Sequence, residues 1–222
     1  MRRILFPLIL GIVGCAILIQ LGLWQLRRME WKEGVIANIE AGIDADPVPL
    51  PEVIDPSMKY LPVTVSGTTG AEIDVLSHTR EQGGGYQVVS RFITDDGRAI
   101  MLDRGFVPQE LRHVERPPTR LSVRGNLHWP DEKGDATPDP NLEENIWFAR
   151  DVPAMAEVLD TEPVLVVASF VEGDAQGVEP IPVAVEGIPN NHLSYAVQWF
   201  LIAATWAGMT VGLIWRIRQR KY

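Results

Sequence analysis

The side chains best suited to bind a ligand in this sequence lie beside two long apolar runs. His192 precedes one run, and Tyr195 and Trp199 follow it at steps of three and four, so a helix would place all three on one stripe. The matching positions at the end of the other run are Trp24, Gln25, Arg28, Trp31 and Lys32. An imidazole can ligate a metal, aromatic rings can flank a flat ligand, and arginine or lysine can pair with anionic groups.

Two interpretations of these side chains stay open on spacing alone. In the first, they form a binding site for a large, flat, amphipathic molecule with anionic groups, a description that haem fits. In the second, they are the aromatic belt and the snorkelling cations that are expected at any membrane interface.

The two apolar runs, residues 4–26 and 195–215, are each long enough to cross a bilayer and contain no charged residue. Both are predicted to be transmembrane helices. The first run is too long for a signal peptide, and the residues after Cys15 stay apolar, which argues against a lipoprotein cleavage site.

Small residues predict that the two helices pack closely. On each helix they share one face, and they are Gly11, Cys15 and Gly22 on the first and Ala204, Gly208 and Gly212 on the second.

Charge predicts the topology. Six of the 20 Lys and Arg residues lie in the two tails, residues 1–3 and 216–222, which leaves 14 against all 29 acidic residues in the intervening region. By the positive-inside rule both tails are expected in the cytoplasm, with residues 27–194 in the periplasm or an equivalent outer compartment. A domain this acidic is an unlikely partner for nucleic acid. Membrane lipid is the expected partner of the two apolar helices.

The region between the helices is predicted to be an antiparallel, β-rich α+β domain, either a sandwich or a barrel. Short β-branched or alternating runs are separated by turn signals, of which the clearest is Asp95-Asp96-Gly97. Residues 60–67 and 72–78 are predicted to be two separate strands. Asp151 is predicted to cap a short helix that begins at Val152.

Catalytic motifs are absent from the sequence, and no enzymatic activity is expected. It has no nucleophile elbow, no metalloprotease motif and no phosphate-binding loop. Its one cysteine cannot form an internal disulfide. His78, His113 and His128 are expected to be solvated.

Three segments together resemble the Surfeit locus family of cytochrome c oxidase assembly factors. They are "LGLWQLRRMEWK" after the first apolar run, "LDRGFVP" in the middle of the domain and "NNHLSYAVQWF" at the start of the second run. Asp103 and Phe106 stand where asparagine and tryptophan are more usual in that family.

The resemblance implies a two-span inner-membrane protein that binds haem a and helps to insert it into the catalytic subunit of a haem-copper oxidase. The start "MRRILF", without an amphipathic transit peptide, favours a bacterial member over a mitochondrial one. The family's haem-associated histidine falls on His192, which becomes the expected axial ligand of the iron. Its expected partners in the site are Trp24, Trp199 and Tyr195 as walls, Arg28 and Lys32 for the propionates, and Arg104 as a further contact. The enzyme of haem a synthesis is a second expected partner, and a scaffold that binds no cofactor is the alternative.

Overall fold

The structure is a computed structural model that describes residues 2–79, 83–184 and 190–219, with side chains from residue 4 onward. The chain divides into two compact units, a helical unit and a β unit that comprises residues 39–184. Each unit is described by itself.

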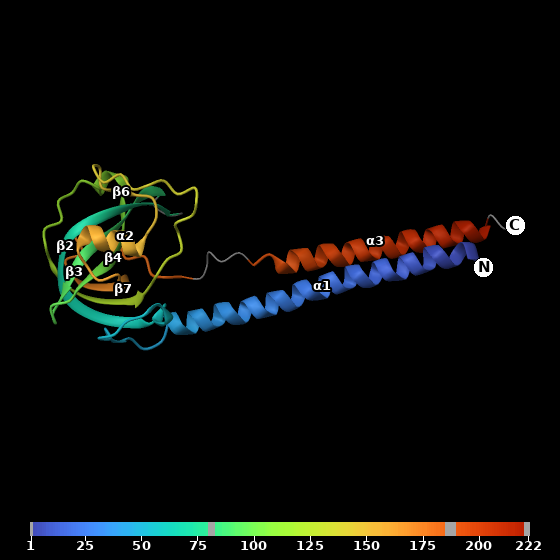
Figure 1. The fold of residues 1–222 in the computed structure, drawn as a ribbon, viewed down its shortest axis with the longest axis horizontal. Helices are drawn as coiled ribbons and strands as arrows, with labels where there is room; N and C mark the ends of the chain where they lie inside the picture. Colours follow the sequence, from blue (N-terminus) through green and yellow to red (C-terminus); the bar gives the residue numbers. More distant parts are fainter. Residues whose placement is uncertain (1, 80–82, 185–189, 220–222) are drawn as a thin grey trace. The chain divides into compact units, whose positions relative to one another are not determined.

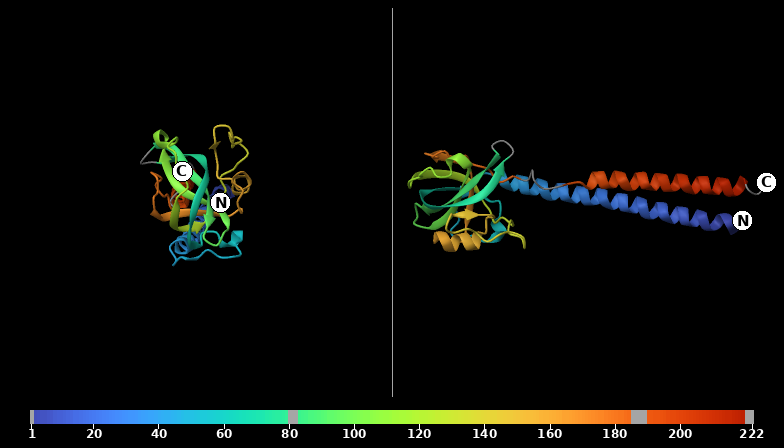
Figure 2. Two further views of the ribbon diagram at one scale, coloured as in Figure 1. Left: turned by 90° about the vertical axis from the view of Figure 1, so that its left-hand side faces the viewer. Right: turned by 90° about the horizontal axis from the view of Figure 1, so that it is seen from above.

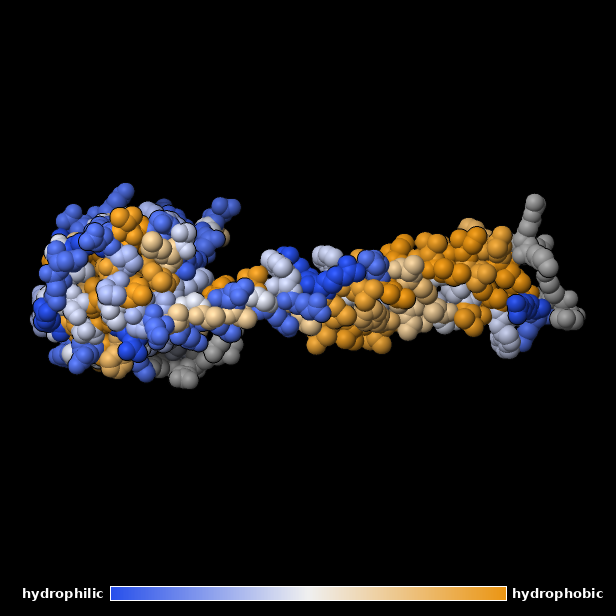
Figure 3. All heavy atoms as spheres, turned by 90° about the horizontal axis from the view of Figure 1, so that it is seen from below, coloured by the Kyte–Doolittle hydropathy of each residue, from blue (hydrophilic) through white to orange (hydrophobic). Residues whose placement is uncertain are grey.

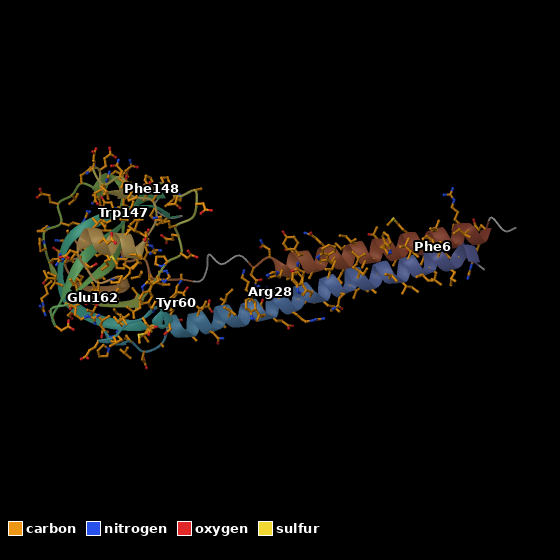
Figure 4. The ribbon with its side chains drawn as sticks, in the orientation of Figure 1. Phe6, Arg28, Tyr60, Trp147, Phe148 and Glu162 are labelled. Carbon is orange, nitrogen blue, oxygen red and sulfur yellow. The ribbon has the colours of Figure 1, made fainter. Side chains whose placement is uncertain are left out.

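The helical unit is an antiparallel pair formed by α1 (Arg2–Ile43) and α3 (His192–Gln219). The two helices lie side by side, with the start of α1 and the end of α3 at the same end of the pair (Figures 1 and 2). Each is long and apolar enough to cross a membrane, and apolar side chains cover much of the surface near the chain ends (Figure 3). Phe6 lies near that end of α1 and Arg28 lies towards the other (Figure 4). At 1.5 Å per residue these two positions are about 33 Å apart, close to the thickness of a hydrocarbon core.

Glycines on α1 allow the two backbones to approach closely, as predicted. A Cβ atom on Gly11 would lie 2.2 Å from the Thr210 side chain, and one on Gly22 would lie 2.5 Å from the Phe200 ring. Between them the Cys15 thiol points at the carbonyl oxygen of Ala203, 3.8 Å away. Small residues on α1 therefore receive larger side chains from α3.

The packing face predicted for α3 is wrong. Gly208 and Gly212 have no atom within 4 Å of a Cβ position, and Ala204 is exposed. Ala196 and Ala203 are buried instead, at 0 % and 6 % exposure. The face of α3 with Ala196 and Ala203 packs against α1 because it also carries the larger side chains that fill the space next to the glycines of α1.

The β unit is a closed barrel. Its neighbouring strands are, in order, β2 (Pro62–Thr79), β3 (Gly83–Thr94), β4 (Ala99–Pro108), β7 (Leu165–Gly173) and β5 (Arg120–Leu127), and β5 pairs again with β2. Two short strands, β1 (Val48–Pro49) and β6 (Ile146–Trp147), also pair with β2.

The sheet is mixed rather than antiparallel throughout. The hairpins and the closing pair are antiparallel as predicted, but β4 and β7 are parallel, as are the pairings of β1 and β6 with β2. A parallel pair needs a crossover, and here the chain between β4 and β7 contains β5, β6 and the helix α2 (Val152–Leu159).

The two strands predicted within residues 60–78 are one long strand, β2, with an irregular register between Thr69 and Glu72. This strand pairs with β5 through its first half and with β3 through its second half. At the crossing, a Cβ on Gly67 would lie 2.2 Å from the carbonyl oxygen of Ile93, so only glycine fits. Bulges of this kind are how a barrel strand changes partner.

Two local predictions are confirmed. Residues 95–98 connect β3 to β4 as a hairpin, with Gly97 at a φ of +89°. The Asp151 carboxylate accepts a hydrogen bond from the backbone N–H of Ala154 at 3.3 Å and so caps α2. The buried face of α2 packs against strands of the barrel through Met155 and Leu159.

Two 3₁₀ turns, η1 (Pro56–Met58) and η2 (Gln109–Leu111), lie in the loops.

Candidate functional site

The candidate site is centred on His192, which is the first residue of α3. Its imidazole Nδ1 lies 2.8 Å from the side-chain oxygen Oε1 of Gln25 on α1. Both side chains are half-buried. Within the part of the chain that the structure describes, this is the one hydrogen bond of the ring, so Nε2 has no partner there.

Two aromatic rings flank this contact and face outward. Trp24 is 52 % exposed and Tyr195 is 51 % exposed. A right-handed helix turns about 100° per residue, and in an antiparallel pair that meets at Gln25 and His192 this turn carries both rings to the same side of the pair. The two rings are therefore available to a ligand that lies against that side.

Arg28 lies on the same side of α1, one turn beyond Trp24. It is exposed, and its guanidinium carbon lies 4.0 Å from the centroid of the Trp31 ring. This cation–π contact holds the positive charge close to the helix without neutralising it. A charge held in this way remains free to pair with an acidic ligand.

Trp199 and Lys32 lie nearer the seam between the helices. Each is seven residues from a member of the Gln25–His192 contact, or two helical turns, and each is half-buried. Lys32 already takes part in an interaction. Asn190, two residues before His192, has a buried side-chain oxygen with no partner among the described residues.

Arg104 belongs to the other unit, on β4, where it is 2 % exposed. Its guanidinium is paired with the Glu72 carboxylate, and Nη2 donates at 3.0 Å both to the Ala175 carbonyl and to the side-chain oxygen of Gln176. Arg116 reaches the same Glu72 carboxylate at 2.8 Å. These hydrogen bonds join Arg104 to other residues of the β unit. The contact with haem that was expected of Arg104 stays a prediction.

A second buried pair lies beside Arg104 in the sequence. Asp103 is 1 % exposed and accepts a hydrogen bond from Arg150 at 2.8 Å. Burial raises the pKa of Asp103 above its usual range, although the Arg150 charge acts in the opposite direction. The Asp103 carboxylate also accepts a hydrogen bond from the backbone N–H of Gly105 at 3.1 Å. Asp103 is thus one member of a largely buried ion pair.

The other histidines differ in their surroundings. His78 and His113 are exposed, as expected. The expectation for His128 is wrong, because its Nδ1 is buried and burial lowers its pKa to about 4. His128 is therefore neutral at pH 7. Its ring lies 5.5 Å from that of Tyr60, and among the described residues no group of three or more possible metal ligands includes it.

Gln25 stands among the interfacial residues of the sequence but was assigned no role in the predicted site. A signal for it was present, because Gly11, Cys15 and Gly22 share the packing face and Gln25 is the next position on it. A polar residue on a face that packs in lipid needs a partner on the other helix. The first polar side chain that α3 offers is His192.

The elements described above define a class of protein in which a pair of apolar helices accompanies a mixed, barrel-like β unit, with a histidine at the start of the second helix. The sequence profile of the SURF1 family matches residues 12–204. The chain belongs to this family.

Similar proteins come from several animals. The chain is 31 % identical to human Surfeit locus protein 1 over 214 residues, which cover 83 % of this chain and 69 % of the human protein. It is 32 % identical to the protein of the same name from Xenopus tropicalis, over 83 % of this chain and 68 % of that one. For the Takifugu rubripes protein the identity is 31 %, with 83 % and 88 % covered.

Proposed function

We propose that this chain is an assembly factor for a haem-copper cytochrome c oxidase. It binds haem a at the periplasmic surface of the bacterial inner membrane and assists its insertion into the oxidase catalytic subunit. Haem is cargo in this proposal, received from the enzyme of haem a synthesis and then released. The protein performs no chemistry on it.

The observation that carries the proposal is the state of the His192 ring. Membership of the SURF1 family supports a role in oxidase assembly, and the ring supports the haem-binding step. One ring nitrogen is engaged by Gln25 and the other has no partner in the described part of the chain, which is the arrangement that protein histidines adopt when they ligate a metal.

Neighbouring side chains suit the rest of a haem molecule. Trp24 and Tyr195 present exposed rings to one side of the helical pair, where they can lie against a macrocycle, and Trp199 closes the inner wall. Arg28 and Lys32 lie at the more polar end, where the propionates of an amphipathic ligand would point. A single imidazole ligand at an interface holds the iron firmly enough for capture and weakly enough for release.

The test is an absorption spectrum of protein purified in detergent after co-expression with haem a biosynthesis. The parent is expected to show a Soret band that the His192→Ala variant lacks. His113→Ala is the control, since His113 is an exposed histidine of the β unit, and it should retain the band. Equal haem in the parent and in His192→Ala, or none in either when both are folded, would refute haem binding through His192.

A cofactor-free scaffold is the second candidate, and one observation favours it. Ala204, Gly208 and Gly212 face away from α1 and leave a side of α3 on which another helix could pack closely. In that case Gly208→Val should abolish oxidase assembly while His192→Ala leaves it intact. The haem proposal expects the opposite result.

A further inference from the structure

The contact between Gln25 and His192 joins residues 167 positions apart in the chain. It lies on the seam of the helical pair, and the packing on one side of it is tight. One turn along α3 Ala196 is fully buried, and one turn back along α1 Gly22 contacts Phe200. This packing holds the backbones at Gln25 and His192 at a fixed separation. At that separation the two side chains can reach each other, and they make the 2.8 Å contact.

The chemistry of the two groups fixes the position of the proton. A carboxamide oxygen can accept a hydrogen bond but cannot donate one, so Nδ1 of His192 must carry the hydrogen that joins it to Oε1. In a neutral imidazole the other nitrogen then has a free lone pair. That nitrogen, Nε2, is the one without a partner among the described residues.

We propose that Gln25 is the positioning residue of the haem site. It selects the tautomer of His192 in which Nε2 is free to bind iron, and it sets the direction of that lone pair. This inference rests on the proposed function, because it assigns a role to Gln25 only if His192 ligates haem. Outer partners of this kind typically change metal affinity by about 10- to 100-fold when they are removed.

The first test needs no haem. Two-bond ¹H–¹⁵N correlation spectra of the haem-free protein in detergent distinguish a protonated Nδ1 from a protonated Nε2. The parent is expected to hold His192 with its hydrogen on Nδ1, and Gln25→Leu is expected to give a mixture of the two tautomers. A parent ring protonated on Nε2 would overturn the inference, since the amide would then be donating to Nδ1.

The second test is a titration of the haem-free protein with haem a. Gln25→Leu should weaken binding by about 10- to 100-fold, and Gln25→Glu, which keeps an acceptor at the same place, should restore most of the affinity. Gln198→Leu is the matched control because Gln198 is an exposed glutamine on α3, and it should bind as the parent does.

A double-mutant cycle separates positioning from a general effect on the helical pair. The loss caused by Gln25→Leu should vanish when it is measured against His192→Ala, because no imidazole remains to be oriented. An equal loss in both backgrounds would overturn the inference and assign Gln25 to helix packing. Unchanged haem affinity in His192→Ala itself would overturn the proposed function, whereas a loss there with none in Gln25→Leu would overturn only the role of Gln25.

Discussion

Glu72 is the residue on which the charges inside the barrel depend. Its carboxylate lies between Arg104 and Arg116, whose side chains are only 2 % and 5 % exposed. Two buried guanidinium groups this close would repel each other strongly without it, because burial removes the water that otherwise screens them. Burial already lowers the pKa of Arg104, and the Glu72 charge opposes that change.

Glu72→Gln is therefore expected to lower the free energy of unfolding by about 3 to 5 kcal/mol, the usual cost of leaving a buried charge uncompensated. Asp95→Asn is the control. It breaks an ion pair with Arg120 whose side chains are 47 % and 68 % exposed, and it should cost less than about 1 kcal/mol. Denaturant titration followed by circular dichroism measures both values. Equal losses would show that the buried network contributes no more than a surface pair.

Sequence alone singled out His192 as the centre of the candidate site but assigned no role to Gln25, its inner partner. His192 stands out because a polar, ligating residue at the start of an apolar run is unusual. Gln25 does not stand out, since one glutamine among interfacial residues resembles its neighbours. The burial of Arg104 was also hidden, because the glutamate that neutralises it is 32 positions away in the sequence.

The helical pair is asymmetric in its packing. Small residues of α1 contact larger side chains of α3, so a substitution by a larger residue has different effects on the two helices. Where a glycine of one helix meets a ring of the other, an added side chain must push the backbones apart. Where a glycine faces outward, the same addition meets nothing from the chain itself.

Gly22→Val is accordingly expected to destabilise the helical unit by about 1 to 3 kcal/mol through overpacking against Phe200. Gly208→Val makes the same chemical change at a position with no atom within 4 Å, and it should leave the melting temperature of the detergent-solubilised protein close to that of the parent. The measurement is thermal unfolding followed by tryptophan fluorescence. If both variants melted together below the parent, the seam assigned to α3 would be incorrect.

Elements that depend on neighbouring residues were predictable, and those that depend on distant ones were not. The two apolar helices, the hairpin at Gly97 and the cap at Asp151 each follow from a few adjacent side chains. The union of two predicted strands into β2 does not, because it depends on β3 and β5 pairing with different halves of it. Nor does the parallel pairing of β4 with β7.

The whole molecule carries its charges in a pattern that predicts its orientation. The start of α1 and the end of α3 lie at one end of the helical pair, both beside basic residues of the sequence, and the β unit holds most of the acidic residues. By the positive-inside rule we expect both tails in the cytoplasm and the β unit in the periplasm.

Single introduced cysteines test this orientation. Ser122→Cys lies on an exposed position of β5, and Arg218→Cys lies on an exposed position near the end of α3. A membrane-impermeant maleimide applied to spheroplasts is expected to label the first and to label the second only after lysis. Cys15 is packed at the seam and can stay in place. The reverse pattern would place the β unit in the cytoplasm.

The closure of the barrel affects how long its strands stay unpaired during synthesis of the chain. β7 bonds to β4 on one side and to β5 on the other, so neither strand completes its pairing until residue 173 has been synthesised. At about 5 to 20 residues per second, the roughly 65 residues after β4 take about 3 to 13 seconds. Throughout that interval one edge of β4 stays unpaired and open to other strands. The nascent chain is therefore most prone to aggregation before β7 emerges, and slower synthesis lengthens its exposure.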